Sequence, residues 1–345
     1  MRGLVKTAPG NGNLELKEFG NPRPGSREVL VEVAAAGICG TDVHIKHGTT
    51  FCSPPVVMGH EYAGRVVKID PSVDSVQVGD AVTSPATAYC GKCYQCKTGH
   101  MNRCTSPRKR ILGASTDGAF ARHVVVPEYI IHKVPKGLSL EEAALAEPTA
   151  CVVHTIAELT PILPGDTVVV LGPGTTGLVA LQVAKAMGAA KVIVTGMSVD
   201  RWKLDIAERL GADITIDVQA QNTADIVKSE TDGVGADVVI EASGSGAARK
   251  QAFDLVKTTG HISLIGIQGR STEIPMDDIV TKELHVLGTW GTLPSTWVTT
   301  LRMMASGKID VRPLITHRLP LSDWQKGFEL MESQKAIKVL FTDLN

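Results

Sequence analysis

The sequence has no long run of apolar residues and no excess of either charge. No segment of the chain reaches about 18 uninterrupted apolar residues, the length that a membrane-spanning helix needs. The opening residues, MRGLVKTAPGNGNLEL, lack the apolar centre of a secretory signal. Lys and Arg number 35 against 36 Asp and Glu, which gives no support to a polyanionic partner. We therefore expect a cytoplasmic protein that has neither a membrane nor a nucleic-acid partner.

Internal repeats and low-complexity tracts are also absent. The one short basic run, PRKR at 107–110, has no interleaved aromatics, so it indicates a solvated loop rather than a nucleic-acid contact. Hydrophobic residues make up 43% of the chain and charged residues 21%, an ordinary globular composition. At 345 residues the chain is long enough for two domains of about 100–200 residues each.

Cysteine is scarce, but four of the seven cysteines lie close together. They stand as C-x2-C-x2-C-x7-C, beginning in CGKCYQC at 90–96. A reducing cytosol disfavours disulfides. The spacing suits four thiolates around one tetrahedral ion, which leaves no open position and therefore implies a structural site. Iron–sulfur proteins have similar runs, but the longer final spacing favours zinc. The predicted ligands are Cys90, Cys93, Cys96 and Cys104.

A second set of metal-binding residue types is spread more widely. Cys39 lies in GICGTDVH, His60 and Glu61 lie in MGHEYAG, and Glu147 lies in AEPTA. Cys, His and carboxylate are the ligands of a zinc that keeps one position open for chemistry. Each residue alone is weak evidence, because an isolated Cys or His is usually a packed core residue. Cys52 and Cys151 fit neither set.

Hydrophobic patterning divides the chain into parts. Residues 1 to about 130 form short β segments (29–38, 61–69, 79–84 and 120–127) separated by Gly and Pro, which favours a sandwich or barrel. Residues 138–159 indicate helix, interrupted at Pro148. Six apolar runs then alternate with helix-length stretches, which predicts a covered parallel sheet. The runs are 167–172, 191–196, 213–218, 237–243, 261–267 and 283–289. A helix at 297–308 and a strand at 337–342 follow.

A glycine-rich loop joins the first of these runs to a helix. GPGTTG at 172–177 has the form G-x-G-x-x-G in the strand–loop–helix context that binds a dinucleotide. The first glycine permits the turn, the second admits the pyrophosphate and the third allows close packing of the helix. The predicted cofactor contacts are Gly172, Gly174, Thr175, Thr176 and Gly177.

The acidic residue that usually binds the ribose of NAD is missing. It belongs about 20 residues beyond the glycine loop, where Gly196 stands. No carboxylate at this place would repel a 2′-phosphate, and Ser198 or Arg201 could bind one. The cofactor stays open between NAD and NADP, and the missing acid favours NADP.

Taken in order, these motifs resemble the zinc-containing medium-chain alcohol dehydrogenases, in the branch of polyol (sorbitol-type) and threonine dehydrogenases. GICGTDVH, GHEYAG, the four-cysteine lobe, AEPTACVVHT, GPGTTG and EASG carry the resemblance along nearly the whole chain. It implies an α/β protein with a GroES-like β-barrel catalytic domain (1–153), a Rossmann doubly wound parallel sheet domain (154–290) and a C-terminal return (291–345). It also implies two zinc ions per chain and a homodimer or homotetramer.

The resemblance implies roles for individual residues. Cys39, His60 and Glu61 are similar to catalytic zinc ligands, and Glu147 stands where a further ligand binds directly or through water. Thr41 resembles the hydroxyl that contacts the alcohol, and Asp42 the carboxylate that orients the ligand histidine. His44 has the spacing of a proton-relay histidine. Ser243, in EASG at 241–244, is expected near the ribose and nicotinamide.

The resemblance implies hydride transfer between a secondary alcohol and NAD(P), the alcohol being a polyol, a sugar alcohol or its phosphate. An L-threonine or amino-alcohol dehydrogenase is the alternative, because 315–331 resembles those enzymes, whereas GTWG at 288–291 resembles sugar-alcohol phosphate enzymes. A non-catalytic nucleotide-binding protein would be expected to lose Cys39, His60 or Glu61, and the zinc-free quinone reductases lack these residues and the cysteine lobe. All three residues are present here.

Overall fold

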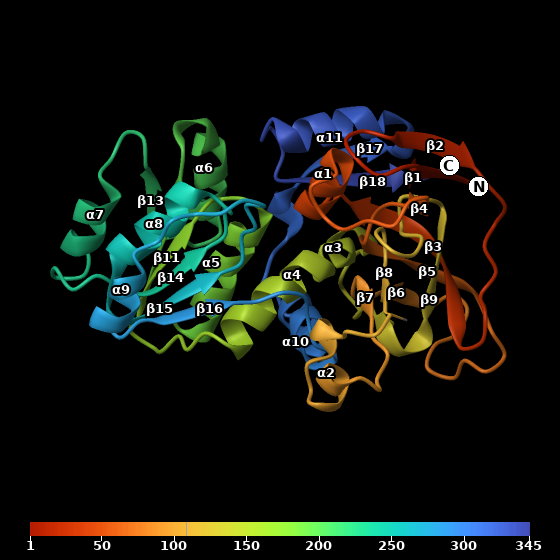
Figure 1. The fold of residues 1–345 in the computed structure, drawn as a ribbon, viewed down its shortest axis with the longest axis horizontal. Helices are drawn as coiled ribbons and strands as arrows, with labels where there is room; N and C mark the ends of the chain where they lie inside the picture. The colour runs from red at the N-terminus through yellow and green to blue at the C-terminus, as the bar shows by residue number, and fades with distance from the viewer. Residues whose placement is uncertain (108) are drawn as a thin grey trace. The chain divides into compact units, whose positions relative to one another are not determined.

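The computed structural model describes residues 1–107 and 109–345, and the chain forms two compact units (Figure 1). The first unit comprises Met1–Ala150, Gly291–Ala305 and Leu314–Asn345. The second comprises Cys151–Trp290 and Ser306–Pro313. Arg108 of the predicted basic loop lies outside the described residues, and its neighbour Arg110 forms an ion pair with Glu28 at 2.6 Å.

The first unit is built mainly of short antiparallel strands. Its largest sheet has the order β10-β6-β5-β3-β18-β17, and β9 also pairs with β3. Smaller sheets have the orders β2-β1-β4 and β7-β8. The strands are β1 (Arg2–Lys6), β2 (Leu14–Glu18), β3 (Glu28–Gly37), β4 (Val56–Val57), β5 (Glu61–Ile69), β6 (Ala81–Thr83), β7 (Thr87–Ala88), β8 (Arg110–Ile111), β9 (His123–Pro127), β10 (His132–Lys133), β17 (Ile315–Pro320) and β18 (Lys338–Asp343).

The C-terminal strand completes this sheet. β18 pairs antiparallel with β3 and parallel with β17, so the last residues of the chain lie beside residues near its start. The helices of this unit are α1 (Gly40–His47), α2 (Tyr94–Lys97), α3 (Leu140–Ala144), α10 (Pro294–Ala305) and α11 (Trp324–Glu332); α4 (Ala146–Val153) carries the chain into the second unit.

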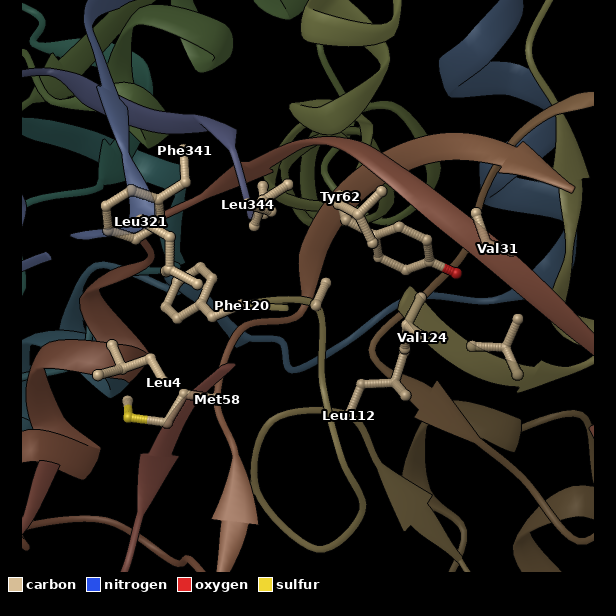
Figure 2. Packing of buried hydrophobic residues seen from close by; sticks show 14 of the residues in the cluster. Leu4, Val31, Met58, Tyr62, Leu112, Phe120, Val124, Leu321, Phe341 and Leu344 are labelled. Atoms are coloured by element: carbon tan, nitrogen blue, oxygen red, sulfur yellow. The ribbon is translucent and has the colours of Figure 1, made fainter. Parts of the chain in front are cut away.

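Alternating apolar residues of these strands enclose the core of the first unit. Figure 2 shows Leu4, Met58, Tyr62, Phe120 and Phe341 within one cluster. The rings of Phe120 and Phe341 meet edge to face at 5.1 Å, which aromatic pairs favour. The hydroxyl of the buried Tyr62 bonds the Ser84 hydroxyl at 2.9 Å, so its polar atom is satisfied inside the core.

The second unit contains a six-stranded sheet of order β13-β12-β11-β14-β15-β16, in which every neighbouring pair is parallel. This is the doubly wound, Rossmann-like order, which reverses between β11 and β14. The strands are β11 (Thr167–Leu171), β12 (Lys191–Gly196), β13 (Ile214–Asp217), β14 (Ala236–Glu241), β15 (Val256–Leu264) and β16 (His285–Gly288). The helices are α5 (Thr175–Met187), α6 (Arg201–Arg209), α7 (Thr223–Ser229), α8 (Gly246–Leu255) and α9 (Met276–Thr281).

The predicted break in the helix at Pro148 is wrong. The interruption falls earlier, at Leu145, between α3 and α4, and Pro148 lies in the first turn of α4. Proline is tolerated there because the first backbone N–H groups of a helix have no intrahelical partner. Ser139 does cap α3: its hydroxyl accepts from the Glu142 N–H, and the Glu142 carboxylate accepts from the Ser139 N–H. In the described part of the chain, no helix is long and apolar enough to cross a membrane.

The ring of His132 stacks on the buried Trp297 with the centroids 5.3 Å apart, and burial lowers the pKa of His132 from the ordinary value near 6.5 to about 4. The folded state therefore favours the neutral ring of His132. The contribution of this ring to the free energy of unfolding is complete above pH 6.5 and is lost as the pH falls from 6.5 toward 4, because the unfolded chain takes up the proton first. Replacing His132 with Phe, which keeps a flat ring, should flatten the loss of stability over this interval. Urea unfolding at several pH values measures the free energy of unfolding of both proteins. If this free energy falls equally with pH in the wild type and in His132→Phe, the prediction is contradicted.

Candidate metal centres and dinucleotide site

The four clustered cysteines converge on one point at the start of α2. Their sulfur atoms all lie within 4.8 Å of one another. The Sγ of Cys93 is 3.5 Å from that of Cys96 and 3.8 Å from that of Cys104. A tetrahedral ion with bonds of about 2.3 Å to sulfur requires sulfur atoms separated by about 3.8 Å. All seven cysteines of the chain are free thiols, so the lobe is not closed by disulfides.

Backbone N–H groups point at these sulfurs. The N–H groups of Lys92 and Cys93 donate to the Cys90 sulfur at 3.4 and 3.3 Å, and the Cys90 N–H donates to the Cys104 sulfur at 3.4 Å. Backbone donors, first that of Cys96, lower the pKa of the Cys93 thiol to about 5. Such donors stabilise thiolates, the form that binds metal. The donor set fits a structural zinc.

A second group brings together Cys39, His60 and Glu61, whose candidate ligand atoms also lie within 4.8 Å of one another. Cys39 immediately precedes α1, and His60 and Glu61 stand at the start of β5. His60 and Glu61 are buried, at 6% and 0% exposure. A turn at Gly59, with φ of 89°, leads into these residues, and a side chain there would collide with the ring of Phe120.

Asp42 lies beside two residues of this group, Cys39 and His60. Its side chain is fully buried, and one carboxylate oxygen accepts from the Cys39 N–H at 2.9 Å. The other lies 3.7 Å from Nδ1 of His60. Burial opposes a charge on His60, but Asp42 and then Cys39 together outweigh it and raise the pKa of the imidazole well above the usual value. A carboxylate at this place lies on the side of the ring from which ligand histidines are usually oriented.

Lys338 of β18 forms a buried ion pair with Glu61. Its ammonium donates to Glu61 Oε2 at 2.6 Å and to the Ile38 carbonyl at 3.0 Å. Burial lowers the pKa of Lys338, but Glu61 and then Cys39 outweigh this effect and raise it. Glu61 Oε1 is buried and has no hydrogen-bond partner among the described residues. An orphaned carboxylate oxygen beside a thiol and an imidazole fits a zinc ligand.

Glu147 lies outside the three-residue group, in the first turn of α4. Burial raises the pKa of its carboxyl to about 7, and His60 partly opposes the shift. Glu147 also lines a cavity of the first unit together with Tyr89, Tyr129 and His132. Glu147 is therefore close enough to interact with the charges of His60 and Glu61, but its carboxylate is not among the close donor atoms of the group.

The two predicted proton-transfer residues lie on α1. Thr41 is half-buried in its first turn, two residues after Cys39. His44 lies one turn further on, and its Nδ1 is 3.1 Å from the Thr49 hydroxyl. The ring is partly exposed, so His44 has access both to a polar neighbour and to solvent.

The glycine loop has the shape that a pyrophosphate requires. Gly172 has φ of 105°, and a Cβ there would contact Ser243. A Cβ on Gly177 would overlap the carbonyl oxygen of Gly172, so only glycine lets α5 start this close to β11. A Cβ on Gly174 would meet nothing within 4 Å, which leaves space beside the N-terminus of α5, where Thr175 and Thr176 begin the helix. Helix N-termini attract phosphate, so the loop fits a dinucleotide.

Ser243 is positioned by the end of β14. Its N–H and hydroxyl both donate to Glu241 Oε1, at 2.8 and 2.6 Å, and the Gly244 N–H donates to the same oxygen at 2.8 Å. The fully buried Glu241 thus holds this turn at the carboxyl end of the sheet, next to the glycine loop. Ligands of doubly wound sheets bind at this end of the strands.

Gly196, Ser198 and Arg201, the residues predicted to lie at the ribose end of the cofactor, have different surroundings. Gly196 ends β12, and the Ser198 hydroxyl donates to Asp217 Oδ2 at 2.7 Å. Arg201 is exposed and its Nε lies 3.1 Å from Asp205 Oδ1. Sequence reasoning missed Asp217, because its position depends on strand order rather than on distance from the glycine loop.

Comparisons with known proteins agree with this architecture. Residues 25–136 match the alcohol dehydrogenase GroES-like domain, and residues 175–306 match the zinc-binding dehydrogenase family. The sorbitol dehydrogenase of Halalkalibacterium halodurans is 38% identical over 100% of both chains. The D-arabitol-phosphate dehydrogenase of Enterococcus avium is 36% identical, over 99% of this chain and 97% of that one. The L-threonine 3-dehydrogenase of Pyrococcus horikoshii is 39% identical, over 99% and 98%.

Solved structures give the same result. A zinc-binding dehydrogenase of Sinorhizobium meliloti bound to NADP has a TM-score of 0.91 and 33% identity, covering 99% of this chain and 98% of that one. An alcohol dehydrogenase of Escherichia coli complexed with NADH has a TM-score of 0.89 and 29% identity, covering 99% of each chain.

The fold, the two donor sets and the glycine loop define a zinc-dependent, nucleotide-linked oxidoreductase. The chain belongs to the zinc-containing medium-chain alcohol dehydrogenase family. It is an enzyme that transfers a hydride between an alcohol and NAD(P), and its cofactors are zinc and the nicotinamide dinucleotide. The predicted family, fold class and cofactors are confirmed.

The two metal centres should respond differently to loss of a thiolate. Cys39→Ser is expected to lower kcat at least about a hundredfold and to remove one zinc, because the open centre loses a ligand while the lobe remains intact. Cys93→Ser is expected mainly to lower the melting temperature, because the closed site contributes folding energy. Zinc analysis, turnover and thermal melting measure both. Full turnover of Cys39→Ser with unchanged zinc content would refute the catalytic assignment.

Proposed function

We propose that the chain oxidises a secondary hydroxyl of a neutral polyol or sugar alcohol. The observation that carries this proposal is the cavity of the first unit that Glu147 lines. Its other polar or aromatic lining includes Thr87, Tyr89, Tyr129, His132 and Thr292, and neither lysine nor arginine is among its described lining residues. His132 is neutral at pH 7 because its pKa is about 4. Hydroxyl groups here match a polyol, and a carboxylate or phosphate finds no cationic partner among them.

In this proposal Cys39, His60 and Glu61 would hold the catalytic zinc, and the buried Oε1 of Glu61 is the oxygen left for it. Bound zinc acts as a Lewis acid that lowers the pKa of a substrate hydroxyl. The Thr41 hydroxyl would accept the substrate proton while it gives up its own hydrogen, and the partly exposed His44 ring, one turn further along α1, would take up that proton and release it to solvent. The glycine loop and Ser243 would hold the dinucleotide, which supplies the hydride-accepting chemistry when bound.

Two related proteins support the polyol assignment and a third supports the alternative. The relative named sorbitol dehydrogenase takes a neutral polyol, as its name says, and supports the proposal directly. The relative named D-arabitol-phosphate dehydrogenase takes a polyol phosphate, so it supports the polyol class but not the neutral form. The relative named L-threonine 3-dehydrogenase matches the chain equally well, so an amino alcohol is the second candidate. The lack of a cation along the described cavity lining favours the first.

We also propose that the enzyme is a cytoplasmic homodimer or homotetramer. Strand β16 forms the edge of the six-stranded sheet and pairs only with β15 among the described strands. Its residues are half-buried or exposed, and nearby Val280 and Met276 of α9 are 76% and 61% exposed. An uncovered edge with apolar neighbours favours pairing with a second copy. Light scattering should give a molar mass of at least two chains, and the mass of a single chain would contradict the proposal.

A substrate panel tests the proposed reaction. Reduction of NAD and NADP should be measured with polyols, sugar alcohols, sugar-alcohol phosphates and L-threonine. Neutral polyols should give a kcat/KM at least about tenfold above that of their phosphates and of threonine, because the cavity lacks a cation for the anionic group. Rates confined to threonine would overturn the polyol proposal in favour of the second candidate.

A further inference from the structure

The carboxyl end of β12 has no room for the acid that usually binds the ribose. A Cβ on Gly196 would lie 2.9 Å from Pro173 Cγ, 3.2 Å from Asp200 Cβ and 3.3 Å from Leu204 Cδ2. The nearest acid in sequence, Asp200, is buried, with one carboxylate oxygen 2.7 Å from the Lys203 ammonium. Its other oxygen accepts from the Met197 N–H at 3.2 Å. Asp200 therefore caps the turn after β12, and because it is buried and paired with Lys203 it is unavailable to a nucleotide.

The neighbouring strand supplies a carboxylate at the same level of the sheet. Asp217, the last residue of β13, pairs in register with Gly196. Its Oδ2 accepts from the Ser198 hydroxyl at 2.7 Å, and its Oδ1 accepts from the Gln219 N–H at 3.0 Å. These two bonds, the Ser198 bond first, lower the pKa of Asp217, so it is ionised at neutral pH. The Gln219 side chain in turn accepts from the Ser198 N–H at 3.0 Å, so Ser198, Asp217 and Gln219 form one closed set of hydrogen bonds.

The two side chains that could bind a 2′-phosphate, Ser198 and Arg201, already interact with carboxylates. Ser198 gives its hydroxyl hydrogen to Asp217. The Arg201 guanidinium lies 3.1 Å from Asp205 and 3.8 Å from Glu208. At this end of β12 and β13, one arginine thus faces three carboxylates, and a further dianionic group would meet net negative charge.

We propose that Asp217 replaces the missing acid of β12, accepts hydrogen bonds from the ribose hydroxyls and makes the chain bind NAD in preference to NADP. The inference rests on the proposed function only in taking the glycine loop as the dinucleotide site. The absence of an acid at Gly196 by itself favours NADP. The carboxylate of Asp217 on the adjacent strand β13 compensates for this absence. The two solved relatives carry NADP and NADH, so the family alone does not decide the cofactor.

Binding of the cofactors tests the proposal without turnover. Dissociation constants for NAD and NADP are measured by calorimetry on the purified full-length protein. The wild-type protein should bind NAD at least about tenfold more tightly than NADP, because a like charge is placed against the 2′-phosphate. Asp217→Asn, which keeps the shape of the side chain, should strengthen NADP binding at least about tenfold and narrow or reverse the ratio.

Two further variants separate the proposal from its alternatives. Asp225→Asn removes one exposed acid of α7 in the same unit and should leave the ratio unchanged. Ser198→Ala should not weaken NADP binding, whereas a selective loss would show that Ser198 is a phosphate ligand. Tighter wild-type binding of NADP, or an unchanged ratio in a folded Asp217→Asn protein, would overturn the proposal. Binding of NAD without any polyol oxidation would instead count against the proposed substrate alone.

Discussion

The buried ion pair between Lys338 and Glu61 is the constraint on which the proposed catalytic centre depends. Two charges removed from water are tolerated only when each finds its partner and further hydrogen bonds. Here Glu61 meets the Lys338 ammonium, which also satisfies the Ile38 carbonyl. Removing one partner of such a pair typically costs about 3–5 kcal/mol. The pairing of the C-terminal strand with β3 places Lys338 beside the proposed metal site, whose residues lie near the start of the chain.

The pair also determines which donor atoms remain for a metal. Lys338 engages Oε2 of Glu61 and leaves Oε1 buried beside Cys39 and His60. A side chain at Gly37 would overlap Oε2, so this glycine at the end of β3 keeps the place of the carboxylate open. Asp42 lies beside the other two candidate ligands, since its carboxylate accepts from the Cys39 N–H and lies 3.7 Å from the His60 ring. Each of the three candidate donors thus has a charged residue beside it, either Lys338 or Asp42.

Sequence patterns predicted the local features of this chain well. Spacing was sufficient for the four-cysteine lobe, and strand–loop–helix context was sufficient for the glycine loop, because both sites are made of residues close together in the sequence. Alternating apolar runs predicted the parallel sheet, although the interruption predicted at Pro148 falls at Leu145. Local signals fail at Pro148 because proline is as compatible with the start of a helix as with its end.

Contacts between distant segments could not be predicted in the same way. Lys338 lies 277 positions from Glu61, and a lysine in a short apolar strand gives no sign of a buried partner. Asp217 meets Ser198 only because β13 lies next to β12 in the sheet order. In both cases the information is in the register of paired strands, which depends on the packing of the whole unit.

The central claim is that Cys39, His60 and Glu61 bind one zinc and the four cysteines of the lobe bind another. Anomalous diffraction recorded on both sides of the zinc absorption edge, from crystals of the purified enzyme, tests this claim most directly. We expect two peaks per chain, one among four sulfurs and one bonded to Cys39, His60 and Oε1 of Glu61. A single peak in the lobe, or a second zinc with Glu61 still bound only to Lys338, would contradict it.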